Sequence, residues 1–270
     1  MKRLLAYCRE LIRGRKQFQQ FFLFLYKTSL VGMNFSGGAV VKNSGEAQVV
    51  DYVSKKLPGT SLRPASPLVI FDVGAHLGDY SRMLLEHLGS RKTAIHAFEP
   101  SAITFEKLRA NLAGKDVALH HFGFSDATKK LPLFYDSPTS VYASVYQRKL
   151  DHENRAMNIS ETVELKTIDD FCKEKNICHI HFLKMDIEGH EFSALQGAKE
   201  TLKNDIDFIQ FEFSAANIDS RTYFKDFYEL LQKDYIIYRV LRDGLFPLEK
   251  YNETQEVFFT TNYLAERKKK

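Results

Sequence analysis

The chain has 270 residues, of which 44% are hydrophobic and 27% charged, a composition that suits one large domain with an extension better than two separate domains. Residues 1–16 carry a net charge of +5 and residues 267–270 carry +4, so the total of +4 leaves −5 for residues 17–266. A mildly acidic body with basic ends argues against a broad nucleic-acid footprint, and no nucleic-acid partner is expected. Three cysteines without metal-ligand clustering argue against a disulfide framework and favour a reducing, cytoplasmic compartment.

In residues 1–31, six basic residues precede the apolar run Phe21 to Tyr26. The run is too short to span a bilayer, and the order of residues typical of a secretory signal is missing. A basic helix with an aromatic face could lie on anionic lipid, which would make the protein peripheral at a membrane. The favoured alternative is that Phe18, Phe21, Phe22 and Leu25 pack on the main domain. A second helix is expected from Glu46 to Leu57, ended by Pro58-Gly59.

The stretch from Leu68 to Ser81 carries the first functional signal. Four apolar residues, Leu68 to Phe71, lead into Asp72, a turn with Gly74 and Gly78, and a helix. Glycine lets the backbone approach a ligand closely, and the free N–H groups of a helix start attract an electronegative group. The pattern predicts a binding loop after a buried strand, and a simple helix cap in an α/β protein is the alternative.

A carboxylate follows the next strand, which we expect at Thr93 to Phe98. This carboxylate belongs to Glu99, in Glu99-Pro100, and its position allows it to accept hydrogen bonds from two ribose hydroxyls. The glycine order is Asp72-x-Gly74-x-x-x-Gly78 and not Gly-x-Gly-x-x-Gly, which favours a nucleoside pocket over a pyrophosphate cradle.

From Leu68 onward, strands and helices alternate, which predicts a parallel sheet covered on both faces. Further strands are expected at residues 117–124, 180–185, 208–213, 235–241 and 256–261, and helices at 101–112, 168–175, 191–198 and 224–233. A turn at Asp243-Gly244 should join the last two strands into an antiparallel edge. Residues 130–135 and 162–165 are expected to form an extra strand pair around the polar loop 137–160, which we assign to substrate contact.

Ser125-Asp126 follows the strand at residues 117–124. At the carboxyl end of a strand beside the nucleoside pocket, Asp126 could accept a hydrogen bond from the adenine amino group. A plain turn residue is the equal alternative.

Together these motifs resemble the class I S-adenosylmethionine-dependent methyltransferases, and more closely the FkbM-type family. The resemblance covers about residues 66–262 and rests on Asp72-Val-Gly-Ala-His-Leu-Gly78, Phe98-Glu99-Pro100, Ser125-Asp126, Lys184-Met-Asp-Ile-Glu-Gly-His-Glu191 and Leu195-Gln-Gly-Ala198. One departure is His76, where the family usually has asparagine. The resemblance implies an α/β, doubly wound, mostly parallel seven-stranded sheet. We expect the methyltransferase domain at residues 64–263, a basic, aromatic helical extension at 1–63, which the motifs do not cover, and a basic tail at 264–270.

The resemblance also implies S-adenosylmethionine as cofactor and methyl transfer to a hydroxyl of a sugar, glycan or small natural product. The cofactor-binding residues are then Asp72, Gly74, His76, Gly78, Tyr80, Ser81, Glu99, Pro100, Ser125, Asp126 and Asp186.

An alcohol is a weak nucleophile at neutral pH, so a carboxylate or histidine should take its proton as the new bond forms. Asp186 is the first candidate because it lies at the carboxyl end of a strand beside the cofactor strand. Glu188, Glu212 and His190 are alternatives, and Glu188 could instead complement a helix dipole. The three carboxylates could also hold a divalent metal, but no dedicated oxygen-ligand loop accompanies them and a metal is not favoured.

The histidines His120-His121 and His179-x-His181 lie on expected strands without a completing ligand set, so we interpret them as structural. Two other functions stay open. One is a catalytically silent cofactor-binding protein associated with membrane or polysaccharide machinery. The other is a nicotinamide dehydrogenase, which the glycine spacing disfavours.

Overall fold

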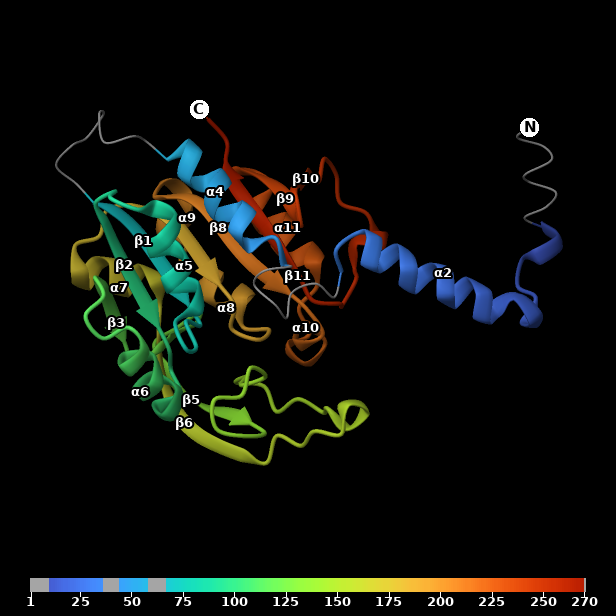
Figure 1. Cartoon of the computed structure of the whole chain (residues 1–270), viewed down its shortest axis with the longest axis horizontal. Helices are drawn as coiled ribbons and strands as arrows, with labels where there is room; N and C mark the ends of the chain where they lie inside the picture. Colours follow the sequence, from blue (N-terminus) through green and yellow to red (C-terminus); the bar gives the residue numbers. More distant parts are fainter. Residues whose placement is uncertain (1–9, 36–43, 58–66, 270) are drawn as a thin grey trace.

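The computed structural model describes residues 10–35, 44–57 and 67–269. Its centre is an eight-stranded sheet in the order β10-β9-β11-β8-β7-β1-β2-β3 (Figure 1). The strands are β1 (Leu68–Val73), β2 (Thr93–Phe98), β3 (Val117–His120), β7 (Ile180–Met185), β8 (Ile206–Phe213), β9 (Tyr235–Leu241), β10 (Gly244–Pro247) and β11 (Thr261–Arg267). Five of them, from β3 to β8, run parallel, while β11 lies antiparallel between β8 and β9. The fold class is therefore the expected α/β sheet, with β10 added as an eighth strand.

Helices cover both faces of this sheet, which explains why the parallel strands are apolar along nearly their whole length. On one face, Val49, Val53 and Leu84 pack with Ile70 and neighbouring strand residues. Phe171, Leu195 and Phe227 pack against the other face in the larger core. The helices are α4 (Glu46–Lys56), α5 (Asp79–Leu88), α6 (Ala102–Asn111), α7 (Ile168–Lys175), α8 (Glu191–Gln196), α9 (Thr201–Asn204), α10 (Ala216–Ser220) and α11 (Phe224–Leu231).

A second sheet of three strands lies beyond one end of the main sheet (Figure 1). Its order is β4-β6-β5, with β4 (Gly123–Phe124), β5 (Lys129–Tyr135) and β6 (Ile159–Lys166). The expected strand pair is confirmed, and it encloses the polar loop. The single strand expected at residues 117–124 is wrong, because the chain leaves the main sheet after His120 and Gly123–Phe124 pair with β6 instead.

The carboxyl-terminal end differs from its prediction. Residues 256–260 form no strand, because the Glu256 carboxylate accepts the backbone N–H groups of Phe224 and Lys225 and so caps α11. Pairing with β8 begins only at Thr261, and the Asp243-Gly244 turn joins β9 to β10. The tail boundary at residue 264 falls inside β11, where Arg267 donates hydrogen bonds to backbone carbonyl groups of the neighbouring segment.

The amino-terminal helix α2 (Gln19–Gly32) projects away from the body (Figure 1). The favoured interpretation, packing of its aromatic stripe on the main domain, is wrong: 54% of Phe21 and 41% of Leu25 are exposed. Only the root of the helix is fixed, where Leu30 packs with Phe35 and Val257. None of the helices in the described residues is long and apolar enough to cross a membrane.

Candidate active site

A cavity of about 410 Å³ opens at the carboxyl ends of β1, β2, β7 and β8. The main sheet supplies one wall, and the second sheet with the polar loop 137–160 supplies the other. Open α/β sheets place ligands at this edge, and the volume lies in the range of small-molecule sites. Predicted residues among those that line it are Gly74, His76, Tyr80, Glu99, Pro100, Asp186, Glu188 and Glu212.

The glycine loop after β1 passes unusually close to the loop after β7. Gly74 has a φ of +78°, and a Cβ atom there would lie 1.9 Å from the carbonyl oxygen of Asp186. A side chain at this position is therefore excluded both by backbone conformation and by space. The close approach brings the binding loop and the acidic Asp186 segment to the same cavity.

Glu99 ties the glycine loop to the start of α6. One carboxylate oxygen accepts the backbone N–H of His76 at 3.1 Å, and the other accepts that of Ser101 at 2.9 Å. The side chain is 7% exposed, and burial raises its pKa to about 7, although both backbone N–H groups favour the charged form. Each carboxylate oxygen keeps a further lone pair for a ligand hydroxyl.

His76, the residue that departs from the family pattern, contacts the polar loop. Its Nε2–H donates to the carbonyl oxygen of Thr139 at 3.0 Å. The carbonyl can only accept, so the ring proton lies on Nε2. This contact joins the glycine loop on one side of the cavity to the polar loop 137–160 on the other.

Sequence reasoning included Lys184 in a motif but gave it no role, although a lysine inside the apolar strand β7 is itself a signal. Its Nζ lies 3.5 Å from Asp72 and 3.6 Å from Asp186, and Asp72 lies directly opposite it in the pairing of β1 with β7. Burial alone would lower the pKa of Lys184, but Asp186, Asp72 and Glu46 together hold it above its ordinary value. Lys184 is thus a charged group in the lining of the cavity.

Asp72 and Ser81 lie beneath the cavity and are fully buried. The Ser81 hydroxyl donates to Asp72 at 2.7 Å, and Lys184 stands at the other carboxylate oxygen. These contacts indicate that Asp72 and Ser81 hold Lys184 and the glycine loop in position. Gly78, at a φ of +88°, caps α5 and lies against the side chains of Leu108 and Leu112.

Three carboxylates, those of Asp186, Glu188 and Glu212, converge with oxygens within 4.8 Å of one another. Burial, reinforced by Asp186, raises the pKa of Glu188 to about 8 and raises the pKa of Glu212 well above its ordinary value. Arg148 contacts Glu188 at 2.6 Å, whereas no ion pair of the described residues joins Glu212 to a basic side chain. The proton retained by this group at neutral pH therefore lies first on Glu212.

Asp186 is the most open of the three, with 37% of its side chain exposed, and it faces the Lys184 ammonium. This arrangement leaves the Asp186 carboxylate accessible to a bound hydroxyl, from which it could accept a proton. The same oxygen ligands also suit a hard cation such as Mg²⁺, so the structure leaves both interpretations of the cluster in place.

Ser125 and Asp126 do not line the cavity in the described part of the chain. The Ser125 hydroxyl donates to Asp126 and accepts from Nε2 of His190, while the Tyr146 hydroxyl donates to Nδ1 of His190. Lys129 contacts Asp126 and, with Ser125, lowers its pKa to about 2. Because both ring nitrogens of His190 are occupied and burial lowers its pKa to about 4, this histidine fits a structural role better than that of a base.

The polar loop contributes to the cavity as expected, and it is pinned to the acidic segment. The Ser144 hydroxyl donates to the carbonyl oxygen of Glu188 at 2.7 Å. Arg148 is nearly buried and bridges Glu188 and Asp219. Tyr142, another lining residue, lies with its ring under Arg155. Glu46, at the start of α4, is a further lining residue that sequence reasoning missed.

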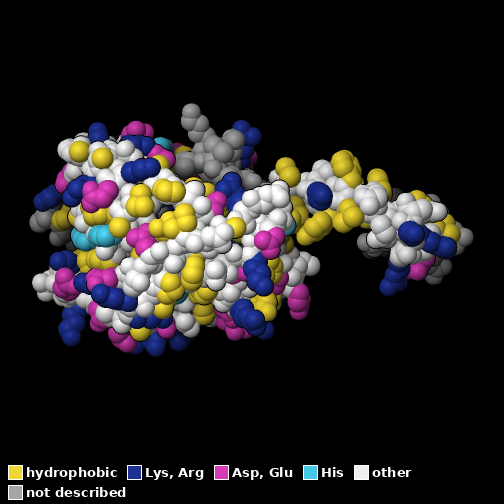
Figure 2. All heavy atoms as spheres, turned by 90° about the horizontal axis from the view of Figure 1, so that it is seen from below, with side chains coloured by type: hydrophobic (Ala, Val, Ile, Leu, Met, Phe, Trp, Pro, Cys, Tyr) yellow, Lys and Arg dark blue, Asp and Glu magenta, His cyan; other side chains and the backbone are white. Residues whose placement is uncertain are grey.

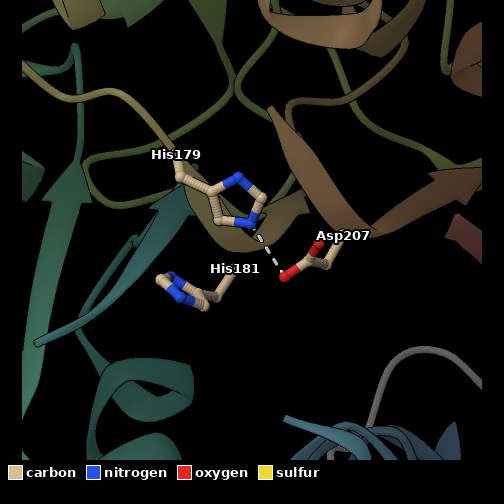
Figure 3. A group of neighbouring side chains, drawn as sticks. All are labelled: His179, His181 and Asp207. Atoms are coloured by element: carbon tan, nitrogen blue, oxygen red, sulfur yellow. Dashed lines mark hydrogen bonds and ion pairs between the residues drawn. The ribbon is translucent and has the colours of Figure 1, made fainter. Parts of the chain in front are cut away.

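A second group of possible metal ligands lies at the amino ends of β7 and β8, where Asp207 completes a set with His179 and His181 (Figure 3). Sequence reasoning found no third ligand because Asp207 belongs to the neighbouring strand. His179 contacts Asp207 at 2.9 Å, and Nδ1 of His181 accepts the backbone N–H of Val69. The proton of neutral His181 then lies on Nε2, so that nitrogen is not available to a metal. The structural interpretation is the better fit.

The strand order and the site at the carboxyl ends of β1, β2 and β7 are those of a Rossmann-like class I methyltransferase fold. The sequence model of the methyltransferase FkbM domain matches residues 72–237, which is more than half of the chain. The chain belongs to the FkbM methyltransferase family.

Three curated relatives illustrate the range of this similarity. The 31-O-demethyl-FK506 methyltransferase FkbM of Streptomyces tacrolimicus is 29% identical over 200 residues, covering 62% of this chain and 75% of that protein. Hexuronic acid methyltransferase AglP of Haloferax volcanii is 26% identical, covering 54% and 56%, and 2-O-methyltransferase NoeI of Sinorhizobium fredii is 27% identical, covering 54% and 63%. The chain thus spans less than two thirds of the last two proteins.

Two solved structures resemble the fold at low identity. Methyltransferase FkbM from Methylobacillus flagellatus KT has a TM-score of 0.44 at 18% identity, covering 79% of this chain and 47% of that one. An O-methyltransferase from Bacillus cereus, in complex with SAH, has a TM-score of 0.44 at 11% identity, covering 97% and 96%.

Proposed function

We propose that the protein is an S-adenosylmethionine-dependent O-methyltransferase that acts on a hydroxyl of a sugar, glycan or small natural product. The observation that carries this proposal is the cavity shared by the Glu99 carboxylate, the Gly74 loop and the Asp186 carboxylate. A nucleoside-binding carboxylate and a base for a hydroxyl are the two groups that such a reaction requires from the protein.

The residues present fit the cofactor. Glu99 keeps lone pairs for two ribose hydroxyls, and Gly74 leaves backbone without a side chain beside the cavity. The Asp186 carboxylate in the cavity lining complements the positive charge of a sulfonium compound. When bound, S-adenosylmethionine supplies an electrophilic methyl group.

The protein's own contribution is position and proton transfer. Asp186 accepts the hydroxyl proton of the acceptor, and the Lys184 ammonium, 3.6 Å away, helps to orient that carboxylate. Glu212, which retains its proton, can donate a hydrogen bond that orients the acceptor. The loop 137–160 lines the opposite wall of the cavity, where it would limit the access of water to a bound acceptor.

The relatives support a hydroxyl acceptor, because the names of two of them specify O-methylation and a third acts on a hexuronic acid. The test is transfer of a labelled methyl group from S-adenosylmethionine to a panel of free sugars, oligosaccharides and polyhydroxylated small molecules. We expect label on an oxygen of at least one acceptor. Cofactor binding without transfer to any acceptor or cell extract would instead support the catalytically silent interpretation.

The affinity for S-adenosylmethionine is expected to depend on pH through Glu99. Ribose hydroxyls donate to the ionised carboxylate, so binding favours the deprotonated form of a group whose pKa is about 7. Affinity should be constant above that pKa and fall as the pH drops below it, by up to about tenfold per pH unit. Calorimetric titration at several pH values on both sides of neutrality measures this dependence.

Glu99→Gln is the matched control for the pH dependence, because its amide does not titrate in this range. The amide can accept only one of the two backbone N–H groups that Glu99 holds, so affinity should be weaker at every pH. Its pH profile should be flat. A wild-type profile that is equally flat would contradict the role given to Glu99.

A further inference from the structure

The helix α2 exposes more large apolar side chains than any packing role within this chain explains. Six of its residues are between 41% and 71% exposed, namely Phe21, Leu23, Phe24, Leu25, Tyr26 and Val31. Figure 2 shows hydrophobic side chains on both sides of the projecting helix. Clusters of this kind on a surface mark a site of contact with a protein or a membrane.

The distribution of these side chains around the helix indicates which kind of partner fits. Residues 21–26 are six consecutive apolar residues, and successive residues of an α-helix point about 100° apart. The apolar surface therefore encircles the helix and does not form one stripe. A groove on a protein, or the same helix of a second copy, would cover one side only, whereas hydrocarbon chains can cover all sides.

The length of α2 argues for shallow insertion. Its 14 residues extend about 21 Å, which is less than the roughly 30 Å of a bilayer's hydrocarbon core. A helix of this length can enter the hydrocarbon of one leaflet without spanning the bilayer.

Basic side chains precede the apolar helix at its end far from the body. Arg13, Arg15 and Lys16 are exposed there, against the single acidic residue Glu10 among residues 10–18, and Figure 2 shows Lys and Arg side chains at that far end. Positive side chains beside an apolar segment complement the headgroups of anionic lipids.

The root of α2 is well attached, so its binding would hold the whole domain. The Asn34 amide donates to the carbonyl oxygens of Ser44 and Val240, and Leu30 packs with Phe35 and Val257. Thr260, close to Val257 in the chain, lines the active-site cavity. Because α2 is firmly attached to the main domain, a bilayer that bound α2 would hold the domain close to the membrane surface.

We propose that α2 is a peripheral membrane anchor that inserts its apolar residues into one leaflet of an anionic bilayer, with Arg13, Arg15 and Lys16 at the headgroups. This proposal is independent of methyl transfer. It requires only the exposed helix and its basic end.

The chain contains no tryptophan, which allows a site-specific test in the full-length protein. A Phe24→Trp variant is mixed with vesicles of phosphatidylcholine alone or of phosphatidylcholine with phosphatidylglycerol. We expect a blue shift of tryptophan emission and co-sedimentation, both stronger with the anionic vesicles and weaker in high salt. An unshifted emission spectrum and protein left in the supernatant with anionic vesicles would overturn the proposal.

Two matched double variants distinguish membrane binding by α2 from nonspecific binding by exposed apolar side chains elsewhere on the surface. Phe21→Ser with Phe24→Ser should lower vesicle partitioning by roughly tenfold or more, because the inserted apolar area is lost. The control pair, Phe246→Ser with Phe259→Ser, removes side chains of similar exposure, 50% and 45%, from the main body and should leave partitioning unchanged. Equal losses in both pairs would contradict an anchor located in α2.

Charge reversal tests the basic end. Arg15→Glu with Lys16→Glu should reduce binding to anionic vesicles by about tenfold or more and leave binding to neutral vesicles nearly unchanged. Light scattering of the same samples tests the alternative that α2 binds a second copy of the chain. A protein that does not bind vesicles, and that forms a dimer which the double substitution Phe21→Ser with Phe24→Ser dissociates, would overturn the membrane proposal.

Discussion

Asp186→Asn is expected to lower kcat by about 10²- to 10⁴-fold, because the amide cannot accept the acceptor's proton. The side chain is 37% exposed and has the same shape in the variant, so the thermal midpoint of unfolding should change little. Single-turnover measurements with bound cofactor separate this loss from any change in cofactor affinity.

Glu212→Gln is the matched control for Asp186→Asn. Glu212 retains its proton at neutral pH, because burial raises its pKa well above the ordinary value, and glutamine resembles the protonated acid. Its kcat should stay within about tenfold of wild type. A loss as large as that of Asp186→Asn, with Asp186→Asn nearly active, would transfer the role of base to Glu212.

Gly74→Ala is expected to destabilise the protein by about 3 kcal/mol or more and to abolish measurable cofactor binding. The new Cβ would lie 1.9 Å from the carbonyl oxygen of Asp186, and backbone atoms cannot move aside cheaply. For a chain of this size, the thermal midpoint should fall by roughly 6–12 °C.

Gly114→Ala provides the control for the effect of backbone conformation alone. Gly114 has a φ of +73°, close to that of Gly74, but nothing lies within 4 Å of its Cβ position. We expect a cost of only about 1 kcal/mol and unchanged cofactor affinity. Equal midpoints for the two variants would show that the contact with the Asp186 carbonyl does not constrain the loop.

The parallel part of the fold could be predicted from sequence because its signals are local. Each central strand is a mostly apolar run followed by a polar or glycine-rich turn, as at Leu68–Val73 and Ile180–Met185. Burial on both faces produces these runs, so their bounds were close to those observed. The strand at residues 117–124 was wrong because a change of sheet leaves no local signal.

The carboxyl-terminal edge and α2 depend on distant contacts. Glu256 serves α11 as a cap, and the pairing of β11 depends on β8 and β9, so neither could be read from nearby residues. The aromatic pattern of α2 has the same composition as a buried stripe. Only the tertiary structure distinguishes a helix that packs on the domain from one that leaves it.

In the site, the positions of Gly74, Glu99 and Asp186 followed from the rule that ligands gather at strand carboxyl ends. Asp126 follows a strand as well, but its strand belongs to the second sheet, and Lys129 and Ser125 hold its carboxylate away from the cavity lining. Glu46 was missed because it comes from the amino-terminal extension, and no local motif connects it with Lys184.

Calorimetric titration of the folded protein with S-adenosylmethionine, and in parallel with NADH, tests the central claim most directly. The cavity at Glu99 and Gly74 predicts saturable heat with S-adenosylmethionine alone, and an affinity lower by about 100-fold in Glu99→Ala, which loses the hydrogen bonds to ribose. Tight binding of NADH, or no binding of S-adenosylmethionine by a folded sample, would contradict the claim.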